Sequence, residues 1–557
     1  MSISDTNNEI FWDTTAYPID YPEIIREVYY RQNIINRKSF TSWIGKTGKK
    51  FNSEIDWWVN PPVSRNPYIS NLFHFICLIK TINELKKKFK RFDLIVESKS
   101  LKEILEKLLG KEKIIKIVAR EKNVFLKKYF DIFKSVFFVI FIYIYINIFT
   151  KKKNLLKDNK KKILIDTFTF ADIKNGERLY KGLDKILNDK KNDFIFFVPT
   201  FLPDRNFFRI GKSASFLSTK NYVFREHYIR LSDLFYAITH RFRIRKFFIK
   251  YDLYQGLNLS NLIKDEIVLS RDYFSTINAL INYRFAKRLS DLKISLKKTI
   301  DWFENQSCDK GWNLGFRRYF PKITTIGYQG YLFFGQYLNT IPSKEENVAK
   351  VIPEKIIVTS PSYIKAKKEF FPKLKVVNGP NFYFNDLQKR FKKKDNIKLL
   401  LILTGIYEID KKLIEWISYL LSENKDLFIV IKAHPILPLK KIKSKFNKLF
   451  KDQIKISNQS LSLLLRNTKI TISCGPTSGT LESLAYNCYL ICPVLEPFDK
   501  FNLELFKIPK NNYKLVYSKV ELEKEIINTI NKKKIPLKKN KIILNRTNNR
   551  SIKLFLN

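Results

Sequence analysis

A turn rich in glycine and hydroxyl side chains, residues 475 to 483, has the composition of a phosphate site. Gly475 and Gly479 allow the backbone to approach a ligand closely, because they lack a Cβ. Hydroxyls beside the free amides of a helix start attract phosphate oxygens, and the turn supplies them from Thr477, Ser478 and Thr480. An ordinary capped helix would have a similar composition, so both interpretations stay open.

Two further polar groups belong to the same predicted site. Glu482 lies one helical turn beyond Ser478, and on that face its carboxylate can accept hydrogen bonds from ribose hydroxyls. His434 ends a strand in the tetrapeptide Lys-Ala-His-Pro, where it can compensate charge on a phosphate, and Lys432 adds a cation nearby. A structural histidine and a solvated lysine are the alternatives for these two residues.

Four short apolar runs must position these groups. Each run ends in polar residues and is followed by a helical or turn pattern, as in a parallel α/β sheet. Ligands bind such sheets beyond the carboxyl ends of the strands. A helix predicted over residues 410–422 has the 3–4 spacing of a core contact. The predicted strands cover residues 399–403, 427–431, 470–473 and 489–493.

The first half of the chain predicts a second α/β unit. We expect strands over 163–166, 194–198, 300–303 and 323–327, with helices between them. A polar, proline-bounded stretch at 342–353 predicts an interdomain linker. The expected domains are therefore an N-terminal acceptor-side domain (1–345), a C-terminal nucleotide-donor domain (346–535) and a basic tail (536–557). The tail is expected to pack back on the first domain.

Composition limits the classes of function. At 557 residues with 45% hydrophobic content, the chain predicts two or three folded domains. Five scattered cysteines argue against a disulfide framework or a zinc site. The net charge of +50 is spread along the chain, and no nucleic-acid-binding motif accompanies it. An anionic membrane surface and anionic substrates are therefore favoured over nucleic acid.

An uncharged apolar segment, residues 135–150, lies between lysines and favours membrane contact. Sixteen helical residues span roughly 24 Å, less than a bilayer core of about 30 Å. A re-entrant or in-plane segment therefore fits better than a single crossing. A buried core element, including a strand, is the alternative. We expect a cytoplasmic protein that is peripheral or monotopic on the inner membrane face.

Short stretches in both halves resemble bacterial surface-carbohydrate biosynthesis proteins of O-antigen, capsule and lipopolysaccharide pathways. The two predicted α/β domains also resemble the GT-B glycosyltransferase fold. The His-Pro and Ser/Thr elements are similar to those of transferases that use cytidine-activated donors. The matching stretches are Pro-Val-Ser-Arg-Asn-Pro-Tyr at 62–68, Phe-Arg-Glu-His-Tyr at 224–228, Trp-Phe-Glu-Asn-Gln at 302–306, Ile-Gly-Tyr-Gln at 326–329, Lys-Ala-His-Pro at 432–435 and Cys-Gly-Pro-Thr-Ser-Gly-Thr at 474–480.

This resemblance implies an α/β fold of two Rossmann-like domains facing a central cleft, with the apolar insertion in the first. It implies transfer of a sugar from a nucleotide-activated donor, such as a CMP-linked sugar, to a surface-polysaccharide or lipid-linked acceptor. No metal or other cofactor is expected, because GT-B enzymes commonly dispense with a metal and the chain has no Asp-x-Asp motif. A non-catalytic membrane-peripheral scaffold, or a degenerate transferase, is the alternative function.

Such a transfer needs a base for the acceptor hydroxyl. Glu304, at the end of a predicted strand of the first domain, is the candidate, and a helix cap is its alternative role. Arg225, His227 and Gln329 are assigned to the acceptor side, although solvated positions would also suit the Arg and the His. The family pattern has a histidine after Gly-Tyr-Gln, where this chain has Gly330, so that histidine cannot act here.

Overall fold

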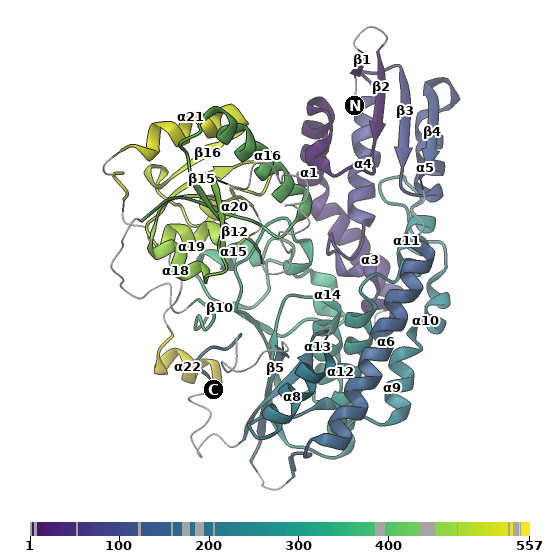
Figure 1. The fold of residues 1–557 in the computed structure, drawn as a ribbon. Helices are drawn as coiled ribbons and strands as arrows, with labels where there is room; N and C mark the ends of the chain where they lie inside the picture. The colour runs from purple at the N-terminus through teal and green to yellow at the C-terminus, as the bar shows by residue number, and fades with distance from the viewer. Residues whose placement is uncertain are drawn as a thin grey trace.

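The computed structural model describes residues 3–4, 8–51, 54–120, 124–156, 160–169, 179–183, 194–203, 206–384, 396–434, 452–475, 477–532, 535–538, 545 and 547–556. Three sheets lie along the chain, and helices surround them (Figure 1). Two of the sheets have six strands each and are parallel throughout, which confirms the predicted α/β class with two Rossmann-like domains.

The C-terminal domain has the strand order β13-β12-β11-β14-β15-β16, in which the sequence order reverses between β11 and β14. This is the dinucleotide-binding order, in which ligands bind at the reversal. Its helices are α16 (Tyr407–Glu423), α18 (Leu461–Arg466), α19 (Gly479–Ala485), α20 (Phe501–Leu505) and α21 (Lys519–Ile530). Its strands are β11 (Ile397–Ile402), β12 (Ile429–Lys432), β13 (Ile454–Ile456), β14 (Thr468–Ile472), β15 (Tyr489–Pro493) and β16 (Tyr513–Val516).

The middle domain has the order β10-β9-β8-β7-β5-β6, which reverses between β5 and β7. Its strands are β5 (Lys162–Thr169), β6 (Ile195–Phe201), β7 (Leu296–Trp302), β8 (Thr324–Gln329), β9 (Lys355–Val358) and β10 (Val376–Asn378). Its helices are α6 (Val124–Phe149), α8 (Phe207–Ser218), α9 (Leu231–Ile238), α10 (His240–Arg243), α11 (Ser260–Leu269), α12 (Tyr273–Asp291), α13 (Ser307–Tyr319), α14 (Lys344–Val348) and α15 (Ser362–Lys367).

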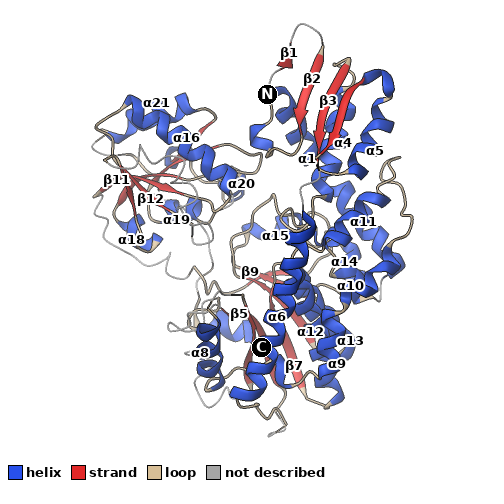
Figure 2. Cartoon of the chain, turned by 45° about the vertical axis from the view of Figure 1, so that its right-hand side comes forward, coloured by secondary structure: helices blue, strands red, loops and turns tan. Residues whose placement is uncertain are grey.

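A third unit, which the sequence did not separate from the first domain, stands at the N-terminus (Figure 2). Its short sheet has the order β1-β2-β3-β4, and the large apolar side chains of its helices fill a core with α11 and α12. The strands are β1 (Ile3–Ser4), β2 (Glu9–Asp13), β3 (Arg91–Val96) and β4 (Ile114–Ala119). The helices are α1 (Glu23–Thr47), α2 (Ile55–Trp58), α3 (Pro61–Ser64), α4 (Leu72–Leu85) and α5 (Lys99–Leu109).

Two boundaries differ from the prediction. The expected change of domain at 345/346 is too early, because β9 pairs with β8 and therefore extends the middle sheet. The expected linker at 342–353 is also wrong, since Ser343 caps α14 and Ile352 is fully buried. Polar composition suggested a linker, but here the polar side chain of Glu346 is buried among cationic partners.

The apolar segment 135–150 forms the greater part of α6, so a strand is excluded. This helix follows the N-terminal sheet and precedes β5, and it therefore joins two units instead of interrupting one. The basic tail does return to the middle domain, as expected. Phe555 of α22 (Asn549–Leu556) packs against Phe382 and Tyr328, with ring centroids 5.2 Å apart in both contacts.

Candidate functional site

The carboxyl edge of the C-terminal sheet gathers the predicted donor residues. β11 ends just before Thr404 and Gly405, whose amides both donate to the Asp410 carboxylate at 2.6 and 2.9 Å. His434 follows the neighbouring strand β12, with Lys432 as the last strand residue. Gly405 has a φ of +87°, and a Cβ there would lie 2.6 Å from the His434 Nδ1 atom. His434 therefore lies directly against the turn at the sheet's reversal point.

The glycine-hydroxyl turn lies across the reversal, after β14. Gly475 has a φ of +46°, and a Cβ there would lie 2.1 Å from an Asp499 carboxylate oxygen. The Ser478 hydroxyl donates to Glu482 at 2.5 Å, so these two side chains meet as their spacing predicts. Burial raises the pKa of Glu482. The turn's remaining polar side chains are therefore ordered around a Ser-Glu pair that a ligand can engage.

Two of the predicted hydroxyls are used inside the turn. Thr477 Oγ1 accepts from the Gly479 amide at 3.3 Å, and Thr480 Oγ1 donates to the Thr477 carbonyl at 3.0 Å. Both threonine side chains are buried. Their observed contacts shape the turn, and Ser478 is the more exposed of its hydroxyl residues. Pro435 and Pro476, which the sequence places beside His434 and in this turn, lie outside the described residues.

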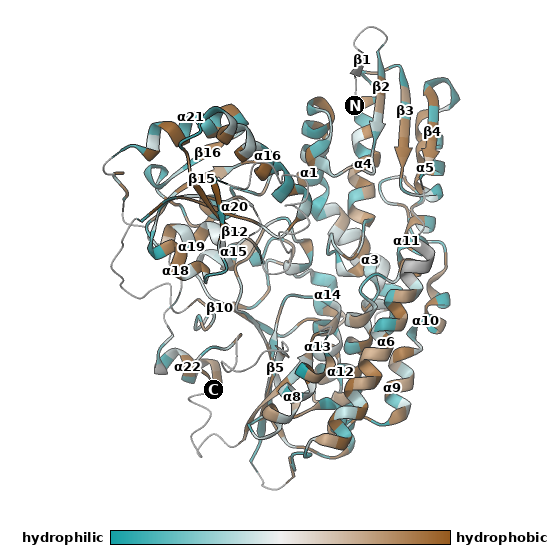
Figure 3. Ribbon diagram, viewed as in Figure 1, coloured by the Kyte–Doolittle hydropathy of each residue, from teal (hydrophilic) through white to brown (hydrophobic). Residues whose placement is uncertain are grey.

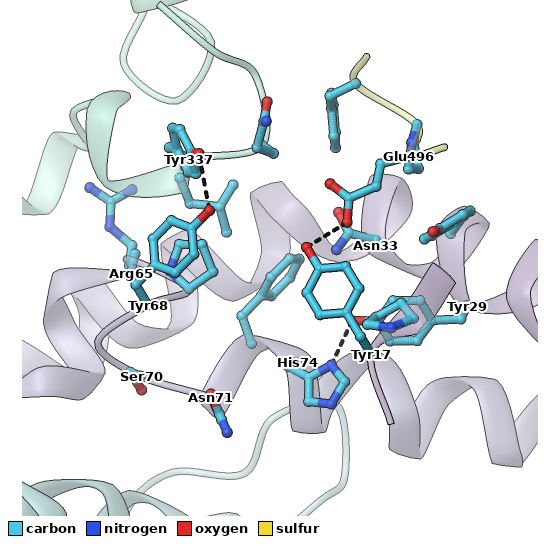
Figure 4. A pocket seen from close by; sticks show the side chains of 18 of the residues that line it. Tyr17, Tyr29, Asn33, Arg65, Tyr68, Ser70, Asn71, His74, Tyr337 and Glu496 are labelled. Atoms are coloured by element: carbon cyan, nitrogen blue, oxygen red, sulfur yellow. Dashed lines mark hydrogen bonds between the residues drawn. The ribbon is translucent and has the colours of Figure 1, made fainter. Parts of the chain in front are cut away.

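A cavity of about 310 Å³ lies between the N-terminal unit and the C-terminal domain (Figure 4). Its wall is aromatic and acidic, although the whole chain carries a net charge of +50. Figure 4 shows the Tyr17 hydroxyl directed at the Glu496 carboxylate, and the Tyr68 hydroxyl directed at Tyr337. The polar lining includes Tyr17, Tyr29, Tyr30, Asn33, Arg65, Tyr68, Asn71, His74, Glu97, Tyr337, Glu408 and Glu496.

Part of the cavity wall comes from loops that follow strands of the C-terminal sheet. Ile406 and Glu408 of the wall follow Gly405 within three residues, and Glu496 lies in the loop after β15. The carboxylate of Asp499, which touches Gly475, accepts hydrogen bonds from the amides of residues 495 and 496 at 2.7 and 2.8 Å. The Asp499 carboxylate thus binds the backbone of one cavity wall and lies against the glycine turn.

Hydroxyls from the N-terminal unit attach that unit to the donor domain. Tyr17 donates to Glu496 at 2.9 Å, and Tyr30 donates to the Leu495 carbonyl at 3.0 Å. Burial raises the pKa of Glu496, and the hydrogen bond from Tyr17 partly opposes that rise. Elsewhere in the cavity wall, the Tyr29 hydroxyl oxygen lies 2.6 Å from His74 Nδ1. Polar groups of both units therefore face the same space, where an acceptor can meet a donor.

Glu304 lies at the carboxyl end of β7, at the reversal of the middle sheet. Its carboxylate accepts a hydrogen bond from the Trp302 indole at 2.9 Å. Burial raises the pKa of Glu304, and the neighbouring Lys367 partly opposes that rise. The helix-cap alternative is wrong, because Gln306 and Asp309 form the capping box of α13. Glu304 is not among the described residues that line the 310 Å³ cavity.

Arg225 and His227, which the sequence assigns to the acceptor side, lie away from the 310 Å³ cavity. Arg225 is 1% exposed, and its guanidinium donates to Asn282 and Asn278 of α12 at 2.5 and 2.9 Å. The His227 ring contacts the Ile146 carbonyl at the end of α6. The short turn that carries both residues packs between these two helices, so neither side chain reaches the cavity, and Arg225 is not solvated.

Gln329 ends β8 and is fully buried. Its Nε2 donates to the Tyr331 carbonyl at 3.2 Å, while its Oε1 has no partner among the described residues. A physical reason also explains why this chain has Gly330 where the family pattern has a histidine. A Cβ at this position would lie 2.3 Å from the Trp302 ring and 2.6 Å from Tyr328. The packing around β7 and β8 therefore leaves no room for the histidine of the family pattern.

The sequence missed most of the cavity. Tyr17, Tyr29 and His74 come from the N-terminal unit, and Glu496 from a loop after β15, so only tertiary structure brings them together. The exceptions belong to the Pro-Val-Ser-Arg-Asn-Pro-Tyr stretch at 62–68, and they are Pro62, Arg65, Pro67 and Tyr68. The five cysteines lie buried as thiols, and the described residues contain no group of three or more His, Cys, Asp or Glu that could hold a metal.

No protein-family model matches the chain, and no curated protein matches it. Among solved structures, a mutant of TarM from S. aureus in complex with fondaparinux, alpha-GlcNAc-glycerol and UDP is 12% identical, with 67% of this chain and 93% of that chain covered and a TM-score of 0.40. S. aureus MnaA with UDP is 12% identical, with 72% and 95% covered and a TM-score of 0.40. A chain of a GtfA/B complex is 13% identical, with a TM-score of 0.33, and the match spans 46% of this chain and 55% of that one.

Proposed function

We propose that the protein is a glycosyltransferase that moves a sugar from a nucleotide-activated donor to a hydroxyl of a glycan or lipid-linked acceptor. The acceptor oxygen forms a bond to the anomeric carbon, and the bond between that carbon and the donor phosphate breaks. The nucleotide leaves with the electron pair, and a base takes the acceptor proton. The proposed donors include CMP-linked sugars, and the proposed pathway is the synthesis of a surface polysaccharide.

One observation carries this proposal: loops that follow β11 and β15 of the C-terminal sheet form one wall of the cavity, and β11 lies at the point where this sheet reverses. Ligands of open parallel sheets bind at that point. His434, Gly405 and the Ser478–Glu482 pair lie at that reversal and offer an imidazole, close backbone approach and ribose acceptors. The N-terminal unit closes the opposite wall with tyrosine hydroxyls. Aromatic rings with a few convergent polar groups are typical of small-molecule sites and suit a neutral, polyhydroxylated acceptor.

Glu304 remains the proposed base. It ends β7 at the reversal of the middle sheet, the position corresponding to the donor edge in the other domain. A raised pKa suits a general base, because proton transfer is most efficient when the pKa lies near the working pH. Glu496 is the competing carboxylate, since it lines the cavity directly. Separate substitutions of Glu304 and Glu496 distinguish the two.

The test is a panel of nucleotides and nucleotide sugars added to the full-length chain. We expect CMP, UDP or GDP to raise the melting temperature, because a ligand at 100 times its Kd stabilises the fold by about 2.7 kcal/mol. Ser478→Ala should weaken the binding of that nucleotide by about tenfold or more, which is the effect of losing a hydrogen bond to a charged group. Ser422→Ala is the matched control, since Ser422 is exposed on α16 of the same domain.

Release of free nucleotide from the matching sugar donor gives a second readout that does not need the acceptor. A chain that binds no nucleotide and releases none would refute the proposed transferase activity. That result would instead support the alternative function of a non-catalytic scaffold. Binding that is equal in Ser478→Ala and in the Ser422→Ala control would place the nucleotide away from the glycine-hydroxyl turn.

A further inference from the structure

Helix α6 has two unlike sides. Phe138, Ile142 and Ile146 are buried, and they pack into the core of the middle domain. The opposite side carries large apolar residues at spacings of 3, 4, 7 and 4, which place them on one face of a helix. That face is solvent-exposed and consists of Phe130, Phe133, Phe137, Ile144 and Ile148.

Neighbouring helices extend this exposed side into a layer. Phe141 of α6 meets Phe207 of α8 with ring centroids 4.8 Å apart. At its other flank, Tyr129 of α6 accepts a hydrogen bond from Arg241 of α10 at 3.0 Å. In Figures 1 and 2, α8, α6, α9 and α10 stand side by side. Figure 3 colours α6 and α9 as strongly hydrophobic.

Each helix of the layer adds exposed apolar side chains. Phe208 of α8 is 85% exposed, Phe235 of α9 is 66% exposed and Phe242 of α10 is 73% exposed. Contiguous exposed apolar surface of this kind marks an interaction site. We define the apolar helix face as Phe130, Phe133, Phe137, Ile144, Ile148, Phe208, Leu231, Phe235 and Phe242.

The charges around this face are almost all positive. Asp131 is the exposed acidic residue among the described side chains of these four helices, because Asp233 is buried and paired with Arg288 at 2.6 Å. The exposed cations on or next to the helices include Lys134, Lys151, Arg209, Lys212, Arg230 and Arg245. An apolar centre with a cationic surround is complementary to an anionic lipid surface, where acyl chains meet negative headgroups.

We propose that the apolar helix face docks in the plane of an anionic membrane surface. The helix is long and apolar enough to span a bilayer over the 21 residues Tyr129–Phe149, within which an 18-residue window has a mean hydropathy of 2.1. Its length therefore differs from the 16-residue segment of the sequence prediction. Its inner side, however, is occupied by the middle domain, and Asn147 donates to the Glu226 carbonyl at 3.2 Å. The helix thus lies on the surface as part of a folded domain, with its outer face in the acyl boundary.

Flotation of the full-length protein with vesicles tests this docking. Vesicles containing phosphatidylglycerol should carry the wild-type chain, vesicles of phosphatidylcholine alone should carry much less, and high salt should reduce the difference. The triple variant Phe133→Ser, Phe235→Ser, Phe242→Ser should lower partitioning by at least about 100-fold, since each buried phenylalanine contributes about tenfold. All three side chains are mostly exposed, so the fold should be retained.

A matched control removes exposed apolar side chains elsewhere. Ile34→Ser, Ile35→Ser, Tyr517→Ser changes residues that are 53%, 61% and 58% exposed, and it should float like the wild type. A triple variant that floats as well as the wild type would overturn the proposal. So would a wild-type chain that stays with the buffer. A wild-type dimer that does not float, and that the Phe variant dissociates, would assign the face to contact between two copies instead.

Discussion

The substitution Glu346→Gln tests the buried contact that positions one wall of the cavity. Glu346 lies in α14 and is 2% exposed. It pairs with Arg65 at 2.6 Å and with Lys310 at 3.3 Å, and all three side chains are buried. Arg65 also lines the cavity. We call these three residues the buried clasp, because it joins the N-terminal unit to two helices of the middle domain.

The expected cost follows from what each cation does when the carboxylate is removed. Arg65 cannot lose its proton, so it loses a charged hydrogen bond, which costs about 1.5–3 kcal/mol. Burial already lowers the pKa of Lys310 to about 8, so it can become neutral. Deprotonation one unit below its pKa costs about 1.4 kcal/mol. We therefore expect a loss of about 3–4 kcal/mol, which agrees with the 3–5 kcal/mol for breaking a buried pair.

The assay is urea unfolding monitored by tryptophan fluorescence. Trp58 can report on the clasp, because its ring centroid lies 5.8 Å from the Lys310 ammonium. Glu345→Gln, on the same helix and with no ion pair among the described residues, is the control, and it should change the free energy of unfolding by less than about 0.5 kcal/mol. A Glu346→Gln loss below about 1 kcal/mol, or one equal to the control, would refute this reasoning.

The pH dependence of the free energy of unfolding tests whether the Glu346 carboxylate is ionised in the clasp. Cationic neighbours hold the pKa of Glu346 below its usual value of 4.5 although burial opposes them. A depressed carboxyl pKa contributes stability that is present above the unfolded pKa and is lost as pH falls through the folded one. The difference in the free energy of unfolding between wild type and Glu346→Gln should therefore have its full size at pH 7 and should become smaller below about pH 4.5. A difference that grows in acid would contradict the ionised clasp.

Three further predictions concern the proposed reaction. His434→Ala should weaken nucleotide binding by about 10-fold or more in titration calorimetry, with the melting temperature of the unliganded protein unchanged. Because burial lowers the pKa of His434 and a phosphate favours its protonated form, wild-type affinity should rise as pH falls from about 7.5 to 5.5, and the alanine variant should lack this slope. Glu304→Gln should lower turnover by about 10²–10⁴-fold with nucleotide affinity unchanged; if Glu496→Gln has that effect instead, Glu496 is the base.

The sequence by itself determined the local chemistry of the C-terminal domain. Apolar runs with polar ends predicted β11, β12, β14 and β15, and these strands pair in parallel. The spacing of Ser478 and Glu482 predicted one helix face, and the two side chains are hydrogen-bonded. Such features depend on residues close along the chain, where the strand alternation and the helical period fix the geometry.

Only the tertiary structure decided which sheet a strand joins and which loops meet. β9 has the composition of any buried strand, yet it pairs with β8 and moves the predicted domain boundary. Tyr17 reaches Glu496 across 479 residues, and Arg225 turned out to be enclosed by α12. The segment 135–150 is uncharged and apolar throughout most of its length in sequence, but packing buries one side of the α6 helix that it forms and exposes the other. Long-range pairing and burial are set by the sum of many contacts, and no local pattern encodes that sum.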